Sequence, residues 1–304
     1  MNSYRLRAYF YLLVTAIIWG AAAPVIKFTL GGIPALPFLT YRFGLSALLA
    51  IIIFAFFKKP KTPRSGKTFF YLLLYGFITS TVALGLLFLG IEKTTVLDST
   101  FITLVGPIMI VLSGVFLLKE RVSRMEKIGM LVAFSGTFFT VIQPLFESRT
   151  SNQIIGNMLV IAYLFANTAS AILVKKLSRE KISALEMTNV SFIIGFVTIA
   201  PLAFAVNGRQ PTLNSITNLP FQYHLGVWFM AFISGSLAYT LWAMGQKTIE
   251  VGEAALFSYL YPVFSAPLAV LWLGEKVTLP FVIGASLISV GVFIAEYKKR
   301  KKTV

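Results

Sequence analysis

The sequence predicts an all-α membrane protein of ten transmembrane helices, arranged as two inverted repeats of five helices each. Three observations favour this fold: the composition is too apolar for an aqueous protein, the basic residues gather in short loops, and the chain matches itself at a fixed offset. Of the 304 residues, 57% are hydrophobic and 12% are charged, and the mean hydropathy is +0.81. A soluble domain carries about 25% charged residues, so water is not the solvent for most of this surface.

Apolar stretches of membrane-spanning length recur along the whole chain, since a spanning helix needs ~20 predominantly apolar residues. The runs between charged or Pro/Gly-rich breaks predict helices over residues 7–29, 36–57, 68–90, 95–118, 124–146, 153–175, 183–206, 224–246, 250–273 and 278–296. The first run is expected to be a retained helix and not a signal peptide, because no small-residue cleavage site follows a short apolar core. A tight hairpin is expected between Gln246 and Glu253.

The placement of the basic residues predicts the orientation. With the N-terminus inside, the cytoplasmic loops and tail hold 21 of the 27 basic residues, the opposite face holds four, and Lys27 and Arg42 lie within helices. The positive-inside rule then places both termini in the cytoplasm of a bacterial-type inner membrane. Basic loops facing anionic lipid also account for the formal net charge of +16, so membrane lipid is the expected contact and nucleic acid is not.

Several classes of chemistry are disfavoured by what the sequence lacks. It has no cysteine and a single histidine, His224, which disfavours disulfides, thiolate chemistry and a histidine metal site. No Walker A loop or Gly-rich nucleotide fingerprint is found. All eleven carboxylates fall at or near helix ends, with only Asp98 and Glu186 about a turn inside. We therefore expect no cofactor, no metal and no enzyme activity, and transport that is either facilitated or proton-coupled.

An internal repeat appears when the chain is compared with itself at an offset of 155 residues. The aligned pairs include Thr79 with Ser234, Thr81 with Ser236, Ala83 with Ala238, Gly90 with Gly245, Val96 with Val251, Thr103 with Ser258, Pro107 with Pro262, Leu118 with Leu273, Glu120 with Glu275, Val122 with Val277, Gly129 with Gly284 and Gly136 with Gly291. Each half holds an odd number of spans, so the second enters the membrane from the opposite side. Residues 1–147 and 152–304 are therefore predicted to be inverted repeats, which can alternately open one central site to each face; the alternative is a repeat kept only as a packing unit.

Particular segments resemble a known family. They are WGAAAPVIK (Trp19–Lys27), YRFGLSALL (Tyr41–Leu49), GPIMIVLSGVFLLKERVS (Gly106–Ser123) and its echo YPVFSAPLAVLWLGEKVT (Tyr261–Thr278), with FANTASAILVKK (Phe165–Lys176) as a looser copy of the first. Together they resemble the drug/metabolite transporter superfamily, in particular the EamA family of ten-helix exporters. The resemblance implies export of small organic metabolites such as amino acids, with a small-molecule substrate between helices 1, 3, 4, 6, 8 and 9.

Polar side chains line up on single faces of three predicted helices at helical spacing. They are Tyr163, Asn167 and Ser170 in helix 6, Ser258, Tyr261 and Ser265 in helix 9, and Thr100 and Thr103 in helix 4. These stripes are predicted to line the substrate route. For the Ser and Thr residues the competing interpretation is a hydrogen bond between helices; for Asn167 and Tyr261 substrate contact is favoured.

Aromatic residues mark helices 1 and 8. Trp19 lies about twelve residues into helix 1, roughly 18 Å from the inner end, which is too deep for an interfacial belt. Together with Tyr239 and Trp242 it predicts an aromatic cavity for apolar or aromatic solutes and organic cations. Core packing is the alternative, especially for Trp242, which is expected nearer the interface.

Two prolines occupy equivalent mid-helix positions in the repeats, Pro107 and Pro262. A mid-span proline leaves a backbone carbonyl unpaired and lets the two ends of a helix move independently, so both are gating candidates, with a static kink as the alternative. The segments Thr79–Thr81 and Ser234–Ser236 also match, and there close helix packing is favoured.

Charged residues within the spans have two possible roles. Lys27 and Arg42 could extend to the outer interface, which is the default, or could contact an anionic group such as the carboxylate of an amino acid. Glu120 and Glu275 each precede a basic residue, so a local ion pair is expected for both.

The sequence as a whole predicts a secondary transporter that exports small organic metabolites, amino acids or related compounds, by alternating access. The alternatives are a polyspecific drug or organic-cation exporter and a non-transporting membrane scaffold. The substrate, the coupling ion, the direction of transport and the oligomeric state stay open at this point.

Overall fold

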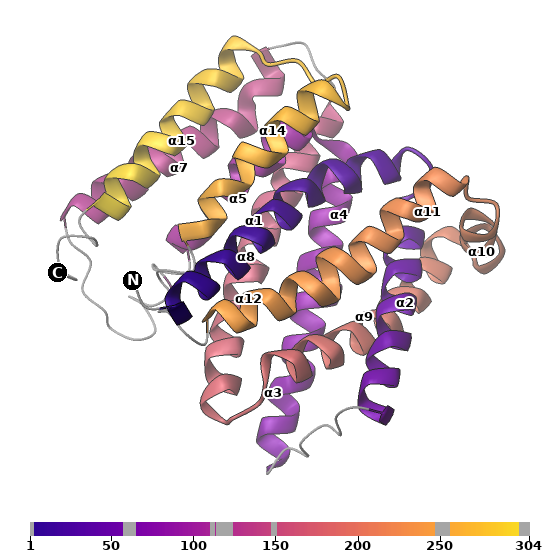
Figure 1. Ribbon diagram of the computed structural model, residues 1–304. Coiled ribbons are helices and arrows are strands. Elements are labelled where there is room, and N and C mark those ends of the chain that lie inside the picture. Colours follow the sequence, from indigo (N-terminus) through magenta and orange to yellow (C-terminus); the bar gives the residue numbers. More distant parts are fainter. Residues whose placement is uncertain are drawn as a thin grey trace.

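The computed structural model describes residues 3–56, 65–109, 113, 124–146, 151–246 and 256–297, and within them the regular structure is helical, with no strand (Figure 1). In the first half of the chain the helices are α1 (Ser3–Leu30), α2 (Ala35–Phe56), α3 (Gly66–Gly76), the π-helical segment η1 (Phe77–Ala83), α4 (Leu84–Lys93), α5 (Val96–Thr103) and α7 (Arg124–Phe146). In the second half they are α8 (Ser151–Arg179), α9 (Ala184–Asn207), α10 (Arg209–Thr217), α11 (Phe221–Trp228), the π-helical segment η2 (Phe229–Leu237), α12 (Ala238–Gln246), the 3₁₀ segment η3 (Leu256–Leu260), α14 (Tyr261–Leu271) and α15 (Leu279–Tyr297).

The predicted fold class is confirmed. Six helices are long and apolar enough to cross a membrane, and four shorter apolar helices, Val96–Met109, Lys127–Phe139, Phe257–Leu271 and Leu279–Ile294, occupy the remaining predicted positions. The helix that begins at α3 continues through η1 and α4, and the one that begins at α11 continues through η2 and α12. Each of the ten predicted spans therefore corresponds to a helical segment among the described residues, and the end of the predicted span 95–118 and the start of the span 250–273 lie outside them.

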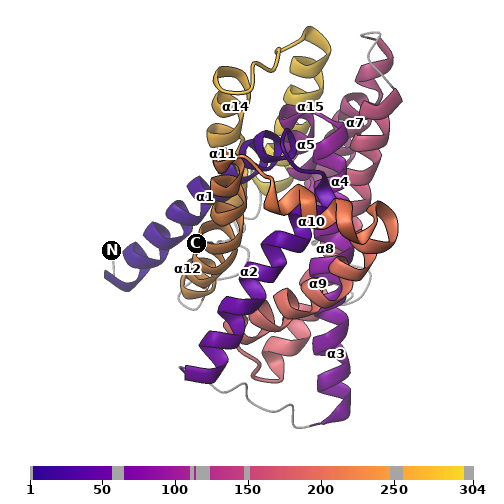
Figure 2. The same ribbon diagram turned by 90° about the vertical axis from the view of Figure 1, so that its right-hand side faces the viewer.

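Helix α10 is the element that the sequence analysis missed, because residues 207–223 were expected to be a loop. Gly208 ends α9 with a φ of 84°, a conformation that glycine adopts readily. The buried hydroxyl of Thr212 donates to the Gly208 carbonyl at 2.8 Å within the first turn of α10. Figure 2 shows α10 lying across α2 and α9, with which it packs.

Side-chain caps fix several helix starts. The Thr95 hydroxyl accepts from the Asp98 backbone N–H at 3.0 Å, and the Ser183 hydroxyl accepts from the Glu186 N–H at 3.2 Å. An acid in the first turn also interacts favourably with the helix dipole. The two acids that the sequence placed a turn inside a span therefore lie in the first turns of capped helices.

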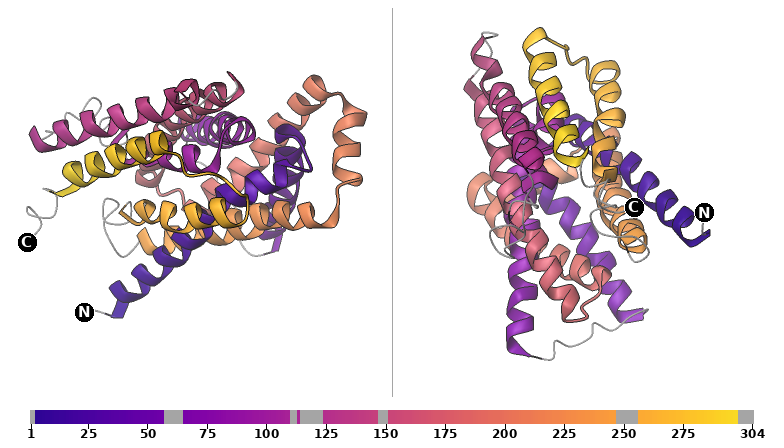
Figure 3. Two further views of the ribbon diagram at one scale, coloured as in Figure 1. Left: turned by 90° about the horizontal axis from the view of Figure 1, so that it is seen from above. Right: turned by 90° about the vertical axis from the view of Figure 1, so that its left-hand side faces the viewer.

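The helix contacts follow the repeat. Helix α2 packs on α9, α7 on α15 and α5 on α14, and each of these pairs joins equivalent helices of the two halves. Helix α1 packs on α12 while its counterpart α8 packs on α4. Figure 3 shows α7 and α15 side by side at one edge, and α1 begins on the side where α15 ends. The contacts therefore have the approximate two-fold relation that an inverted repeat imposes.

Repeat-matched glycines form the contact between α7 and α15. A Cβ on Gly136 would lie 2.9 Å from the Gly284 carbonyl oxygen and 2.6 Å from the Ile288 backbone nitrogen, and a Cβ on Gly291 would lie 2.6 Å from the Gly129 carbonyl oxygen. Small residues let membrane helices approach closely, where dispersion replaces the hydrophobic effect. The internal match of these glycines thus has a packing cause.

Some predicted features lie outside the described residues. These are the ion pair of Glu120 with Arg121, the hairpin after Gln246 and the basic tail over residues 298–302.

Candidate functional site

An aromatic cluster forms around Trp19 in the middle of α1. The Trp19 ring centroid lies 5.0 Å from that of Tyr239, 5.3 Å from that of Trp242 and 6.2 Å from that of Tyr261. Tyr239 and Trp242 come from α12 and Tyr261 from α14, so both repeats contribute. The edge-on contacts to the two tyrosines are favourable arrangements of ring quadrupoles. We call these four residues the aromatic cluster.

A widened helical turn helps to hold Trp19. Its indole Nε1 donates to the Ser234 carbonyl at 3.0 Å, within the π-helical segment η2. Segment η1 in the first repeat is also π-helical and overlaps η2 at the repeat offset of 155 residues. A π-helical turn disturbs the regular i→i−4 ladder, leaving carbonyls available to other donors, and is common at functional sites. The matched segments Thr79–Thr81 and Ser234–Ser236 therefore also alter the backbone, which the sequence interpretation of close packing did not include.

Tyrosines of both repeats lie within electrostatic range of Tyr239, a member of the aromatic cluster. The Tyr239 hydroxyl interacts electrostatically with those of Tyr75, Tyr163 and Tyr261, and Tyr261 also shares a side-chain hydrogen bond with Ser258. The predicted candidates Tyr163, Tyr239 and Tyr261 therefore lie within electrostatic range of one another, and Ser258 lies beside Tyr261. Tyr75 is a buried addition that sequence reasoning missed, although its position one turn before the polar Thr79–Thr81 stripe was a signal.

The polar face of α8 meets η1. The Ser170 hydroxyl hydrogen-bonds with that of Thr79. Asn167, three residues before Ser170, is partly exposed. Ser170 therefore makes a contact between helices, while the Asn167 amide lies on the same polar stripe with part of its surface accessible.

The threonines of α5 bond to their own backbone and to α14. The Thr100 and Ser265 hydroxyls lie 2.8 Å apart and are buried, and the Thr103 hydroxyl donates to the Thr100 carbonyl at 2.7 Å. The Thr100–Ser265 bond joins equivalent helices of the two repeats.

Each of the paired prolines follows an interruption of its helix. A turn at residues 104–105 ends α5 before the helical residues that include Pro107, and the 3₁₀ segment η3 gives way to α14 directly before Pro262. Proline suits the first turn of a helix because it lacks an N–H that would have no partner there. The spans are therefore broken at equivalent places, where the sequence analysis expected kinks.

Lys27 caps the C-terminal end of a helix, and the expectation that its side chain extends to the outer interface stays a prediction. Its Nζ donates to the carbonyls of Ile91, Glu92 and Thr94 at 2.8, 3.2 and 2.6 Å. These carbonyls are at the C-terminal end of α4, where a cation is favourable. All three donors of the ammonium are thus used by the backbone.

Arg42 is buried, although its side chain was expected to extend to the outer interface. The residue is 2% exposed, and its guanidinium carbon lies 5.5 Å from the Phe43 ring centroid and 5.3 Å from that of Phe88. The side chain is therefore enclosed between aromatic rings and does not reach the surface of the protein. It interacts electrostatically with Tyr239, which links it to the aromatic cluster.

Glu275 joins the two repeats at one end of the bundle. Its carboxylate accepts from the backbone N–H groups of Val96 at 2.6 Å and Leu97 at 2.9 Å, at the start of α5. The expected ion pair with Lys276 is wrong, because the carboxylate turns to this helix N-terminus, where an anion is favourable. Burial raises the pKa of the Glu275 carboxyl above its ordinary value, against the opposing effect of the two hydrogen bonds and of Lys27.

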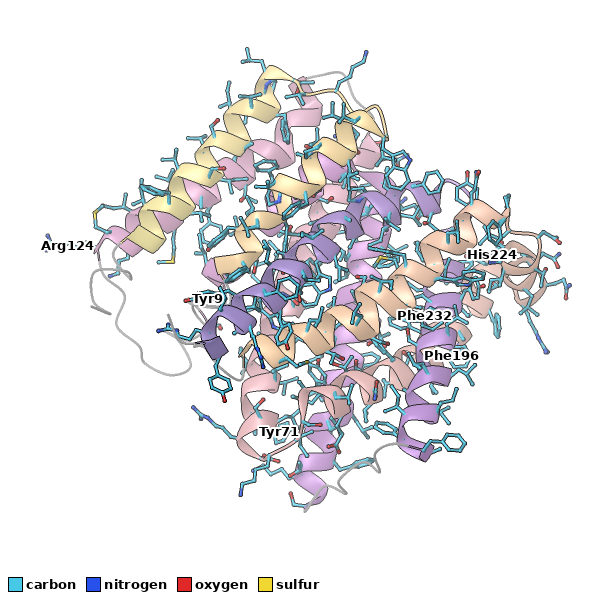
Figure 4. The ribbon with its side chains drawn as sticks, viewed as in Figure 1. Tyr9, Tyr71, Arg124, Phe196, His224 and Phe232 are labelled. Carbon is cyan, nitrogen blue, oxygen red and sulfur yellow. The ribbon has the colours of Figure 1, made fainter. Side chains whose placement is uncertain are left out.

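His224 belongs to a separate cluster on α11 (Figure 4). Its Nδ1 lies 3.0 Å from the Tyr41 hydroxyl, which also accepts from the Trp228 indole N–H at 3.0 Å. Polar-tipped aromatic side chains at a helix end are typical of the membrane–water interface. Within the described residues no group of three or more His, Cys, Asp or Glu side chains could hold a metal ion.

Comparison with known proteins follows this geometry. The EamA-like transporter family model matches the chain twice, over residues 6–142 and 154–297. The chain belongs to the EamA-like transporter family. It is therefore a multi-pass membrane transporter and not an enzyme, as predicted.

Its relatives are mostly named for transport alone. The chain is 27% identical to the uncharacterized transporter YyaM of Bacillus subtilis (strain 168), over 95% of this chain and 93% of that protein. It is 25% identical to a "Probable amino-acid metabolite efflux pump" of Escherichia coli (strain K12), over 93% of this chain and 92% of that protein. A crystal structure with 18% sequence identity superposes with a TM-score of 0.61 over 98% of this chain and 99% of the other, which supports the fold.

The predicted site residues thus fall into distinct places. Trp19, Tyr163, Tyr239, Ser258 and Tyr261 lie together, whereas Thr100, Thr103, Ser170 and Ser265 engage partners on or between helices. Sequence reasoning did not anticipate the burial of Arg42 or the contact between Glu275 and α5.

Proposed function

We propose that this transporter exports small organic metabolites, amino acids or related compounds, across a bacterial-type inner membrane with both termini in the cytoplasm. The aromatic cluster carries the proposal, because it combines large apolar faces with tyrosine hydroxyls and an indole from both repeats. Binding sites for small molecules combine mostly apolar walls with a few convergent polar groups. The name of the Escherichia coli relative supports the same solute class.

Alternating access is the mechanism that this arrangement favours. We treat residues 1–147 and 152–304 as the two units. Each contributes helices to the site, and helices of each pack against helices of the other. A rocking motion of the repeats would open the aromatic cluster to one face while the other is closed. The helix interruptions at Pro107 and Pro262 supply equivalent flexible points, one in each unit.

The test is flux into liposomes that contain the purified full chain. The panel holds labelled amino acids, nucleosides and organic cations, each with and without an imposed proton gradient. Saturable uptake of amino acids or related compounds supports the proposal, and dependence on the gradient identifies proton coupling. Uptake of many organic cations with no preference for amino acids contradicts it and favours the polyspecific exporter. No flux in a folded, inserted protein favours the scaffold.

Matched variants test whether the flux depends on the aromatic cluster and on Asn167. Trp19→Ala removes the central ring, and Phe10→Ala removes an exposed ring from the same helix. Asn167→Ala removes the partly exposed amide, and Phe165→Ala truncates an exposed ring two residues away. We expect Trp19→Ala and Asn167→Ala to raise KM or abolish flux while the two controls retain it. Equal loss in all four variants would contradict the assignment.

A further inference from the structure

Arg42 is a buried cation whose hydrogen bonds are incomplete. Its Nε and Nη1 atoms are buried and have no hydrogen-bond partner within the part of the chain that the structure describes. A guanidinium remains protonated in proteins and carries five N–H donors. A buried charge normally has a partner, and an ionisable residue within a membrane span that faces the interior indicates a functional site.

Three of the described carboxylates make hydrogen bonds to groups other than Arg42. Glu92 accepts from the first backbone N–H of α2 at 2.9 Å, Asp98 from the Gln153 amide at 2.6 Å, and Glu275 from the start of α5. The electrostatic partner of the Arg42 guanidinium among the described residues is the Tyr239 hydroxyl. The protein therefore supplies aromatic faces around this cation and leaves an anionic partner to be supplied from outside.

A second donor lies beside the same rings. The Ser80 hydroxyl is buried in the π-helical segment η1 and has no partner among the described residues. A Cβ added to Gly195 would lie 2.8 Å from the Ser80 Cβ and 3.1 Å from the Phe43 ring, so Ser80 and Phe43 are neighbours across α9. The unpartnered hydroxyl and the unpartnered guanidinium thus both border Phe43.

A continuous series of rings joins Arg42 to the aromatic cluster. Phe43 contacts Phe192 at a centroid distance of 6.2 Å, Phe192 contacts Tyr239 at 6.3 Å, and Tyr239 contacts Trp19 at 5.0 Å. A small solute with one anionic end and one apolar end would match this gradient from cation to aromatic faces. Guanidinium–carboxylate pairs are bidentate and strong in a low dielectric.

We propose that Arg42 binds the carboxylate of the transported solute, while the apolar or aromatic body of the solute lies against the aromatic cluster. The inference rests on the proposed function and narrows it to carboxylates with an apolar or aromatic body. Organic cations without a carboxylate are then poor ligands, because the site presents a like charge.

Binding to the purified full chain in detergent tests the proposal, with three probes that share one ring. L-Phenylalanine and 3-phenylpropanoate carry a carboxylate, and phenethylamine lacks it; binding is followed by the change in tryptophan fluorescence and by the thermal shift. We expect the two carboxylates to bind and the amine to bind far more weakly. Arg42→Gln should weaken binding of both carboxylates on the order of 100-fold, because a buried charge pair loses one partner.

Two further variants keep this result interpretable. Arg42→Lys preserves the charge without the planar fork, so it should restore part of the affinity, and Arg209→Gln removes an exposed arginine as the control. Because Arg42→Gln removes an unpaired buried charge, we expect its melting temperature to equal or exceed that of the unaltered protein. If Arg42→Gln is destabilised, the unaltered protein still tests the proposal, because it should bind the carboxylates and bind the amine far more weakly.

The outcomes separate the two levels of inference. Loss of carboxylate binding in Arg42→Gln, with no loss in Arg209→Gln, supports the proposal that Arg42 binds the carboxylate of the solute. Equal binding of phenethylamine and 3-phenylpropanoate, or an unchanged carboxylate affinity in Arg42→Gln, overturns it while the proposed export function stands. Failure of every amino acid and related compound to move into liposomes overturns the proposed function itself.

Discussion

Replacing Lys27 by methionine separates the three roles that this residue could have. The methionine keeps an unbranched side chain of similar length but removes the ammonium that donates to Ile91, Glu92 and Thr94. The last carbonyls of α4 then lose their cap in a partly buried place. An interfacial side chain would tolerate the change, and a contact with substrate would alter transport alone.

The structure gives the expected magnitude. A hydrogen bond to a charged group contributes about 1.5–3 kcal/mol. The three bonds of Lys27 share one ammonium whose desolvation offsets part of their sum, so we expect a loss of about 2–3 kcal/mol in the free energy of unfolding. One kcal/mol shifts Tm by about 2–4 °C in chains of 150–250 residues. A decrease on the order of 5 °C or more should follow in this chain.

Thermal unfolding in detergent, followed by tryptophan fluorescence, measures this change. Lys93→Met is the control, because Lys93 is exposed and surface substitutions stay within about 0.5 kcal/mol. Lys27→Arg should retain most of the stability, since it keeps a cation at the helix end. If Lys27→Met melts together with Lys93→Met, the capping role is refuted; if transport alone is lost, Lys27 contacts the substrate.

Three further predictions concern contacts between the repeats. A double-mutant cycle of Thr100→Ala and Ser265→Ala should give a coupling energy of about 0.6 kcal/mol in unfolding, with KM unchanged; a KM effect without coupling would favour substrate contact. Gly136→Ala should destabilise the protein by about 1–3 kcal/mol, because its Cβ meets the backbone of α15; an unchanged Tm would contradict the close approach. Burial raises the pKa of the Glu275 carboxyl. The carboxyl therefore binds a proton more readily when it is packed against the start of α5 than when that contact is broken and its pKa is ordinary. The contact between Glu275 and the start of α5 should therefore be fully favoured below the ordinary carboxyl pKa of about 4.3. This preference should be lost as pH rises through the raised pKa. The chain has no cysteine of its own, so one cysteine label before α5 and one after α14 would report the distance between these two helix ends. Glu275→Gln should remove the pH dependence of this distance, and an increase of the distance in acid would contradict the prediction.

Features that depend on composition and residue spacing could be predicted from the sequence. The number of spans follows from apolar runs because lipid requires about 20 apolar residues for each crossing, and the repeat follows from residues that recur at one offset. Trp19, Tyr239 and Tyr261 could be singled out because large polar-tipped rings deep in a membrane span are unusual there. Helix α10 could not be predicted, since the break before it depends on the backbone conformation of Gly208.

The amino-acid sequence by itself determined the membrane class, the ten helices, the inverted repeat and a set of candidate polar and aromatic residues. Only the tertiary structure decided what each charge contacts: Lys27 caps α4, Glu275 caps α5 from the other repeat, and Arg42 is enclosed among aromatic rings. The physical reason is that hydropathy and periodicity report the preference of a residue for lipid or water. The partners of a buried charge are set by helices that are distant in sequence and meet only in the folded bundle.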